Sequence, residues 1–494
     1  MRLRYSTIVN YLSMIYRLIA SVGFTVVIAR KLAPHDFGVW GITLSTTLMI
    51  ANLWGIIDFW MRRDIARGDL EAFYAGTFAA LFYATVAGVA HVLLGWAQSV
   101  IFGWPLEAFL ASVPMTLAAV MDRYFSTAVS MIKPEGVGYK NMVLDTVRLV
   151  IALATVNVIG KVVYTPIVAY TLGFTSSSAL SLTILLRLGI RPRLGDLGRV
   201  REWIKAAYVP LANVVRLSAL GGIRAVASWA TGSELSVAYL NVGLSSQTAI
   251  VRASAQSTPA LYARLLKGRG GEDVEEVLRL FILVTGFLAS SFIVLSKTIA
   301  SLYNPLYVGA WPVVVIVTLF GVAEGLANIL TVSALGSVKS EKLTWNELKR
   351  TPLFRVTYAR VAALAASILA GSVLARALVP DYLKAAEYFA ASLLAGSAAY
   401  TIWVGGYVRH SLRFMAPWKE VLAGVLASAS VAAYYALAGV SGLIIESFWS
   451  AVPSLLLHGG VALIMYVLVW YALSPWFRWL VRASLSYLGR FFTG

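Results

Sequence analysis

Two apolar stretches of similar length decide the fold, and each carries an arginine near its middle. The first, IVNYLSMIYRLIASVGFTVVIA, spans residues 8–29 and contains Arg17. The second, VPLANVVRLSALGGIRAVASWA, spans residues 209–230 and contains Arg216, 199 positions further on. Each stretch is long enough to cross a bilayer as one helix. An arginine at mid-membrane depth costs roughly 2.5–3.5 kcal/mol of insertion free energy. Its presence in both stretches therefore indicates a functional role.

Composition places the whole chain in the membrane. Of its 494 residues, 59% are hydrophobic and 13% are charged, which excludes an ordinary soluble protein. The chain has no cysteine and four scattered histidines, so we expect no disulfide, no metal site and no cofactor. The net charge of +18 is typical of cytoplasmic loops that face anionic lipid, and it does not require a nucleic-acid partner.

Apolar runs of about 20 residues predict an all-α, polytopic membrane protein with about 14 transmembrane helices. The predicted spans lie near residues 7–29, 38–58, 76–99, 103–131, 141–160, 163–187, 205–230, 235–260, 276–296, 307–336, 356–379, 383–408, 419–440 and 447–473.

The loop charges orient these spans. Twenty-seven lysine and arginine residues, with Lys133 and Lys140 among them, fall on one side of the predicted membrane, and six fall on the other. The positive-inside rule then places both termini in the cytoplasm of a multi-pass cell-membrane protein. We expect its partners to be membrane lipids and a lipid-borne substrate, and we expect it to act as a monomer.

The first six predicted spans and the next six resemble two copies of one unit. At the 199-residue offset Gly23 also matches Gly222, and Arg148 matches Arg360 at an offset of 212. Two six-helix lobes that enter from the same side imply a parallel repeat with a central cavity. The predicted domains are an N-terminal lobe, a C-terminal lobe, an additional two-helix hairpin and an amphipathic tail, at residues 1–190, 191–410, 411–473 and 474–494.

Eight arginines lie inside the predicted spans. Four of them, Arg123, Arg148, Arg279 and Arg360, are close enough to span ends to snorkel toward water. The other four are deeper and would have to face a neighbouring helix or a water-filled cavity. Together with two asparagines on the same helical faces, they are the candidate substrate-binding residues: Arg17, Arg216, Arg224, Arg252, Asn241 and Asn213.

Acidic residues in the spans are few, so the predicted cavity is cationic and favours an anion. Asp145 and Glu324 are the candidates for coupling transport to H⁺ or Na⁺. Asp145 is three residues from Arg148, at the spacing of a helical ion pair, so a structural pair is the alternative for this acid. Stripes of Ser, Thr and Asn equally predict hydrogen-bonded helix packing. Trp40, Trp54, Trp229 and Tyr239 are expected in the interfacial aromatic belts rather than in a sugar-binding site.

The N-terminal segment resembles a known family of exporters. The sequences NYLSMIYRLIASVGFTVVIARKLAPHDFGVWGITLS and WGIIDFWMRRDIARGD are similar to the opening of Wzx-type polysaccharide flippases of the multidrug/oligosaccharidyl-lipid/polysaccharide exporter superfamily. The shared elements are a first helix that ends in Arg-x-Leu, a Pro-x-x-Phe-Gly turn and a basic stretch before the third helix. The residues that fill the first turn here are Arg30, Leu32, Pro34, Phe37 and Gly38.

This resemblance implies alternating access and export of a lipid-linked oligosaccharide, a polyprenyl phosphate or diphosphate sugar, to the outer leaflet. It implies no enzymatic activity. The two extra helices at 419–473 resemble a pair that forms a lipid-tail groove in lipid II flippases, and packing against a lobe is the equal alternative for them. An ion-coupled multidrug exporter of the same superfamily is the alternative, although such cavities are usually acidic. A membrane glycosyltransferase or polymerase is disfavoured, because no predicted loop exceeds about 20 residues.

Overall fold

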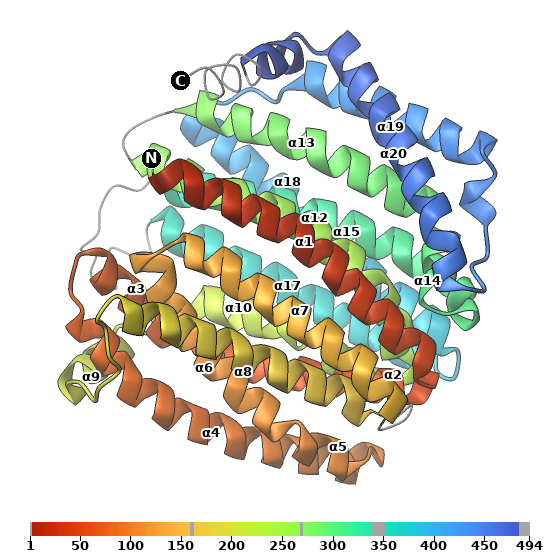
Figure 1. The fold of residues 1–494 in the computed structure, drawn as a ribbon. Coiled ribbons are helices and arrows are strands. Elements are labelled where there is room, and N and C mark those ends of the chain that lie inside the picture. The colour runs from red at the N-terminus through yellow and green to blue at the C-terminus, as the bar shows by residue number, and fades with distance from the viewer. Residues whose placement is uncertain (1, 159–162, 267–269, 337–350, 484–494) are drawn as a thin grey trace. The chain divides into compact units, whose positions relative to one another are not determined.

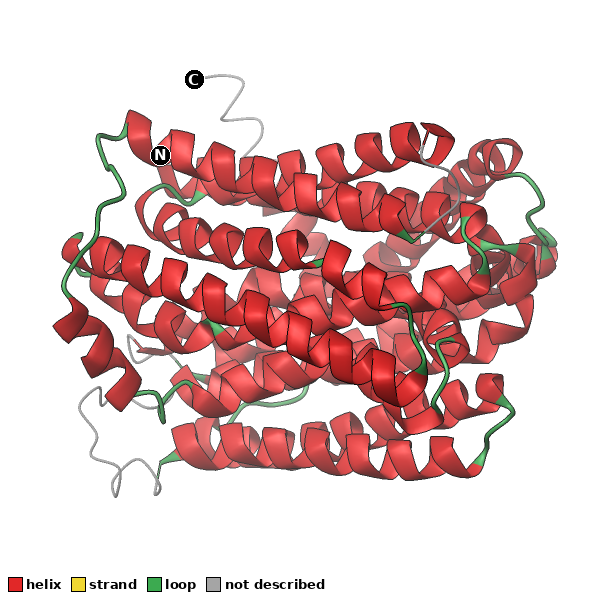
Figure 2. Ribbon diagram, turned by 90° about the horizontal axis from the view of Figure 1, so that it is seen from below, coloured by secondary structure: helices red, strands yellow, loops and turns green. Residues whose placement is uncertain are grey.

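A computed structural model describes residues 2–158, 163–266, 270–336 and 351–483. In these ranges every regular element is a helix (Figure 2). Among the described residues, eight helices are long and apolar enough to cross a membrane, and the bent pair of α2 and α3 makes a ninth when it is counted as one span. The prediction of an all-α, polytopic membrane fold is therefore confirmed.

The described part of the chain divides into two units. The first comprises residues 1–241 and 360–389, and the second comprises 242–359 and 390–494. Helix α12 (Leu235–Leu266), α17 (Pro352–Ala377) and α18 (Tyr382–Leu412) each contribute to both units. The other helices of the first unit are α1 (Arg2–Lys31), α2 (Pro34–Leu53), α3 (Gly55–Ala66), α4 (Glu71–Phe102), α5 (Leu106–Ala111), α6 (Val113–Ile132), α7 (Glu135–Val158), α8 (Tyr164–Arg187), α9 (Leu197–Lys205), α10 (Leu211–Gly221) and α11 (Ile223–Thr231) (Figure 1).

Local sequence explains where these helices begin, bend and end. Pro34 opens α2, where its missing N–H costs nothing. Gly103 takes the left-handed conformation, φ 72°, that ends α4, and Gly232 does the same for α11 with φ 69°. The axis bends by 46° between α2 and α3. A second break separates α10 from α11 at Gly222, although the matching Gly23 lies inside the continuous helix α1.

The core of the first unit is a layer of helices in which α7 packs against α1 and α8, and α6 packs against α8 and α4. Helix α2 packs along α10 and α11. A side chain at Gly38 or Gly41 would collide with the start of α12, so both glycines permit a close approach of α2 to that helix. At this end of the unit His35 Nδ1 lies 2.7 Å from Glu234 Oε1, and these residues are 199 positions apart.

The short helix α9 lies on the surface formed by α3 and α4. Asp196 caps it by accepting a hydrogen bond from the Gly198 N–H. The Trp203 indole donates to the Asp64 carboxylate at 3.1 Å. A hydrogen bond from the Arg199 guanidinium lowers the pKa of Asp69 below its usual range. The sequence 191–205 thus forms a fixed surface element beside the membrane-spanning helices.

The second unit is built on α13, which packs against α15 and α19, while α19 packs against α20. Tyr466 on α20 donates to the Leu283 carbonyl of α13 at 2.9 Å, and Ser428 on α19 donates to the Gly286 carbonyl. The predicted hairpin is therefore packed against α13, and the connection between its two helices also accepts a hydrogen bond from Thr298 at the Val440 carbonyl. The remaining elements are α13 (Gly271–Val294), α14 (Ser296–Tyr303), η1 (Pro305–Ala310), α15 (Trp311–Gly336), α19 (Trp418–Leu437), η2 (Val440–Gly442) and α20 (Phe448–Leu473). The last eleven residues of the predicted tail lie outside the described residues.

Candidate functional site

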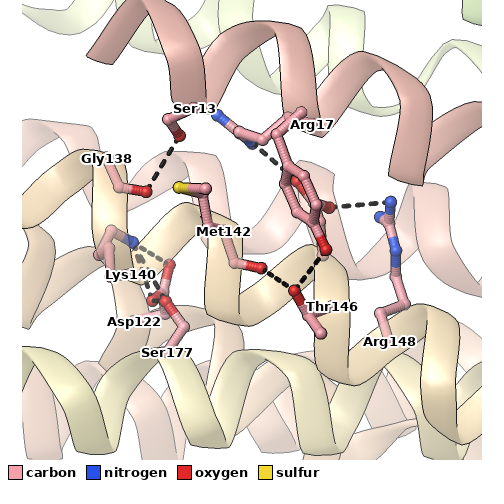
Figure 3. Close-up of polar contacts among 11 residues, drawn as sticks. Ser13, Arg17, Asp122, Gly138, Lys140, Met142, Thr146, Arg148 and Ser177 are labelled. Atoms are coloured by element: carbon pink, nitrogen blue, oxygen red, sulfur yellow. Dashed lines mark hydrogen bonds and ion pairs between the residues drawn. The ribbon is translucent and has the colours of Figure 1, made fainter. Parts of the chain in front are cut away.

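The first charged cluster joins α1 to α7 through one carboxylate (Figure 3). Asp145 Oδ2 lies 2.9 Å from Arg17 Nε, and Asp145 Oδ1 lies 2.9 Å from Arg148 Nη2. The Asp145 side chain is 2% exposed and the Arg148 side chain 6% exposed, whereas that of Arg17 is 25% exposed. The predicted ion pair between Asp145 and Arg148 is confirmed, and Arg17 is a second partner. Two arginines share one acid, so the cluster keeps a net positive charge.

Aromatic rings hold Arg148 in place. Its guanidinium carbon lies 4.6 Å from the ring centre of Phe24 and 4.7 Å from that of Tyr170, within the range of cation–π attraction. Among the described residues its Nε atom has no hydrogen-bond partner. The Arg148 side chain is packed between helices α1 and α8, so the structure favours the ion pair with Asp145 over snorkelling toward the membrane surface.

Trp40 belongs to the same group of rings. Its ring centre lies 5.9 Å from that of Phe24 and 6.1 Å from that of Tyr170, and the residue is 4% exposed. Trp54, at the bend between α2 and α3, is 1% exposed. Both indoles are therefore packed against neighbouring helices, whereas their assignment to an interfacial belt concerns membrane depth and stays a prediction. Hydropathy identifies a tryptophan as membrane-embedded, but it does not distinguish the lipid-facing side of a helix from the packed side.

A second charged cluster was missed in the sequence. Lys140 Nζ lies 2.9 Å from each carboxylate oxygen of Asp122, and the Ser177 hydroxyl donates to Asp122 Oδ1 at 2.6 Å. The predicted position of Lys140 in a cytoplasmic loop is wrong, because this residue is 3% exposed and lies inside α7. The hydropathy window began the fifth span one residue too late to include it. No spacing along one helix indicates this pair, because Lys140 lies on α7 and Asp122 on α6.

The third cluster lies where α10 and α11 meet. Arg224 donates from Nε to the amide oxygen of Asn241, and the Asn241 amide nitrogen lies 3.5 Å from the carbonyl of Phe37. In the part of the chain that the structure covers, no carboxylate forms an ion pair with Arg224. Tyr170, which also contacts Arg148, is a further neighbour of Arg224. The guanidinium is thus held by neutral groups, unlike Arg17 and Arg148.

The remaining predicted site residues are distributed over both units. Arg216 is buried on α10, and its Nη2 lies 3.4 Å from Oδ1 of the exposed Asn213. In the second unit Arg252 is half-buried on α12, and Glu324 is buried on α15. The structure therefore brings together Arg17 with Asp145, Arg224 with Asn241 and Arg216 with Asn213.

Polar side chains on α12 and α15 have the packing role that the sequence left open for them. Thr318 donates to the Ser246 hydroxyl at 2.9 Å, and Asn328 donates to Ser254 at 3.4 Å. Gly321 lets the two helices approach, because a side chain there would lie 2.9 Å from the Cα atom of Gln247. Among the described histidines and acids, no group of three or more is arranged to hold a metal ion.

Comparison with known proteins identifies the architecture. No protein-family model matches the sequence, and no curated protein is significantly similar to it. Among solved structures, the lipid II flippase MurJ in an inward closed conformation matches with a TM-score of 0.66 and 11% identity, over 95% of this chain and 99% of that one. An inward-facing multidrug resistance MATE family transporter of the MOP superfamily matches with a TM-score of 0.57 and 13% identity, over 83% and 100% of the two chains.

The chain has the fold of these transporters. A third match is a MOP superfamily transporter from Pyrococcus furiosus, described as having a binding pocket of reverse polarity that suggests a different function. Its TM-score is 0.55 at 14% identity, over 83% of this chain and 95% of that one. These neighbours are transporters and a flippase rather than enzymes, and they agree with a multi-pass membrane protein. Identities of this size establish the fold alone.

Proposed function

We propose that the protein is a flippase that moves a lipid-linked oligosaccharide, a polyprenyl phosphate or diphosphate sugar, from the cytoplasmic to the outer leaflet by alternating access. One observation carries the proposal: cationic charge inside the helices of the first unit exceeds acidic charge. Arg17 and Arg148 share Asp145, and Arg224 is held by the neutral amide of Asn241. Within a membrane such an excess favours an anionic ligand.

The chemistry of the substrate fits this charge. A polyprenyl diphosphate sugar has a head too polar to cross hydrocarbon and a tail too apolar to leave it. Arginine suits the head because its planar fork binds phosphate oxygens in a bidentate manner and stays charged where water is scarce. A similar fold in the lipid II flippase MurJ supports this substrate class, as does the Wzx-like opening sequence.

Arg224 is the residue best prepared to exchange its partner. Its bond to the Asn241 amide oxygen is a charged-to-neutral hydrogen bond, and a phosphate oxygen would replace it with a stronger, charge-assisted one. Arg17 and Arg148 already have a carboxylate partner, so we assign them to the electrostatic field around the head group. Arg216 and Arg252 are further candidates on the neighbouring helices.

The test is a flipping assay in proteoliposomes with a labelled polyprenyl diphosphate sugar. Removing a charge-assisted phosphate contact costs about 1.5–3 kcal/mol, so Arg224→Ala should flip roughly ten- to a hundredfold more slowly. Arg224→Lys keeps the charge but loses the planar fork, so its flipping rate should lie between that of Arg224→Ala and that of the wild type. Arg193→Ala is the matched control, because this arginine is 63% exposed and pairs with Glu71 at the surface. Equal rates for Arg224→Ala and the wild type would exclude this role for Arg224.

The rival function is an ion-coupled multidrug exporter, which the MATE neighbours support. It predicts efflux of cationic dyes by proteoliposomes with an imposed H⁺ or Na⁺ gradient, with Glu324 or Asp145 as the coupling acid. The excess of arginine disfavours cationic drugs electrostatically. Dye efflux at an undiminished rate in Arg224→Ala, without flipping of the sugar lipid by the wild type, would favour the exporter.

The orientation of the chain in the membrane can be tested in cells that express it, because the chain has no cysteine and a single introduced cysteine therefore reports its own position. The predicted topology places Arg67 in a cytoplasmic loop and Glu107 near the outer surface, and both residues are exposed. In intact cells a membrane-impermeant maleimide should label Glu107→Cys and leave Arg67→Cys unlabelled until the cells are opened. The reverse pattern would place both termini outside.

A further inference from the structure

Lys140, Asp122 and Ser177 come from three different helices and form one buried cluster (Figure 3). The residues are 3%, 7% and 0% exposed, respectively. Asp122 lies on α6, Lys140 on α7 and Ser177 on α8. The cluster belongs to the first unit and is separate from the shared Asp145 carboxylate that binds Arg17 and Arg148.

All three protons of the Lys140 ammonium have an oxygen acceptor. Nζ lies 2.9 Å from both carboxylate oxygens of Asp122 and 3.5 Å from the hydroxyl oxygen of Ser177. The Ser177 hydroxyl in turn donates to Asp122, which orients its own lone pairs toward the ammonium. This surrounding offers a small monovalent cation one full negative charge and one additional hydroxyl oxygen. Here the cation is attached to the chain.

Stability alone does not account for such a group. Two buried charges lose their hydration, and a well-packed apolar pair of the same volume is often as stable or more stable. Breaking the pair is a different matter, because an isolated carboxylate inside the membrane is strongly unfavourable. The ionised form of Asp122 therefore requires a positive charge beside it, and Lys140 supplies one that cannot diffuse away.

We propose that Asp122 and Ser177 form a monovalent-cation site that Lys140 fills permanently with its own ammonium group. The consequence is that this position works without Na⁺ or another exchangeable cation. The proposal concerns the charge balance of three helices and does not depend on what the protein transports. It predicts a vacancy that can be refilled when the lysine side chain is shortened.

The geometry also predicts which ions refill the vacancy. Nitrogen–oxygen distances of 2.9 Å suit an ammonium group or a cation of similar size, such as K⁺. Na⁺ is smaller and would bind less well unless the helices moved inward, and choline is too large. Methylammonium is the best probe, because it restores the ammonium and part of the missing side-chain volume.

The experiment compares the thermal unfolding of full-length Lys140→Ala in methylammonium, potassium, sodium and choline chloride at equal ionic strength and pH. In choline the variant should melt roughly 5 °C or more below the wild type, because Asp122 has lost its partner. Methylammonium should recover at least half of that loss, followed by K⁺ and then Na⁺. The wild type should melt at the same temperature in all four salts.

Two further variants separate this effect from general salt stabilisation. Lys140→Met/Asp122→Asn has neither charge, so it should fold and be insensitive to the cation. Lys140→Ala/Ser177→Ala lacks one oxygen ligand and should respond less to methylammonium than Lys140→Ala does. Thermal unfolding is measured without substrate, so a failure here leaves the transport proposal untouched.

Three results would overturn the proposal. One is a melting temperature of Lys140→Ala that is the same in all four salts. Another is stabilisation of this variant by acid alone, which would mean that a proton rather than a cation neutralises Asp122. The third is an equal cation response in the doubly neutral variant. If Lys140→Ala cannot be purified, Lys140→Gly expressed with and without methylammonium gives the same comparison as yield of folded protein.

Discussion

Replacing Asp145 by asparagine is expected to destabilise the protein more than removing either of its arginine partners. At an effective dielectric constant of about 20, unit charges separated by the 2.9 Å seen in both contacts attract by about 6 kcal/mol, before the cost of desolvation. Asp145→Asn loses both attractions and leaves two guanidinium groups facing each other's charge. We expect a loss of about 3–5 kcal/mol in the free energy of unfolding.

Arg17→Gln is the milder change. Arg148 still neutralises Asp145 in this variant, and Arg17 is one-quarter exposed, so water compensates part of the loss. The expected cost is about 1.5–3 kcal/mol, the range for a hydrogen bond to a charged group. In Asp145→Asn/Arg148→Met the buried, unpaired guanidinium is removed as well, so this double variant should be more stable than Asp145→Asn alone.

The assay is unfolding in mixed micelles by increasing mole fractions of SDS, followed by tryptophan fluorescence. Arg193→Ala serves again as a surface control and should unfold with the wild type. The reasoning is refuted if Arg17→Gln loses as much stability as Asp145→Asn, or if the double variant is no more stable than Asp145→Asn. Either result would show that the carboxylate is not the shared centre of this cluster.

Three smaller effects follow from other contacts. Gly38→Ala should lower the free energy of unfolding by about 1–3 kcal/mol, and Gly41→Ala should lower it by a smaller amount. The methyl group at position 38 would meet a rigid backbone carbonyl, whereas the one at position 41 would meet side chains. Melting temperatures in the opposite order would contradict this reasoning. Arg199 lowers the pKa of Asp69, so their ion pair should stabilise docked α9 above about pH 4 and be lost as the pH falls through the lowered pKa. At this exposure the stabilisation is at most about 1 kcal/mol. Protease sensitivity of the segment before α9 should therefore depend on pH in the wild type but not in Arg199→Ala. Tyr466→Phe should cost about 0.6 kcal/mol, typical of a hydrogen bond between membrane helices, and SDS unfolding at an unchanged midpoint would show that the bond to α13 is not stabilising.

The sequence was sufficient for the fold class and for one ion pair, and the reasons are local. Apolar runs of membrane-spanning length and the i, i+3 spacing of Asp145 and Arg148 are properties of a single helix. The partner of Asp122 was not predictable in the same way. Lys140 lies just outside the apolar run, and only the packing of α6 against α7 and α8 shows that the lysine points inward.

The site was predicted in part for a related reason. Composition correctly indicated that arginines exceed acids within the helices, but it did not reveal which arginine has an acidic partner. Arg17 and Arg224 look alike in the sequence, each near the centre of an apolar stretch. In the structure the first binds a carboxylate and the second binds an amide. That difference arises from contacts between helices, which hydropathy does not encode.

The contact between His35 and Glu234 has a consequence for the symmetry of the predicted repeat. The two residues are separated by 199 positions, the same offset that relates Arg17 to Arg216. In a symmetric dimer of two identical ancestral halves, a position on the twofold axis meets its own copy. It would then pair histidine with histidine or glutamate with glutamate. The observed contact joins a histidine to a glutamate, so the two predicted copies differ at this position, and a strictly symmetric dimer of either copy would lack this ion pair.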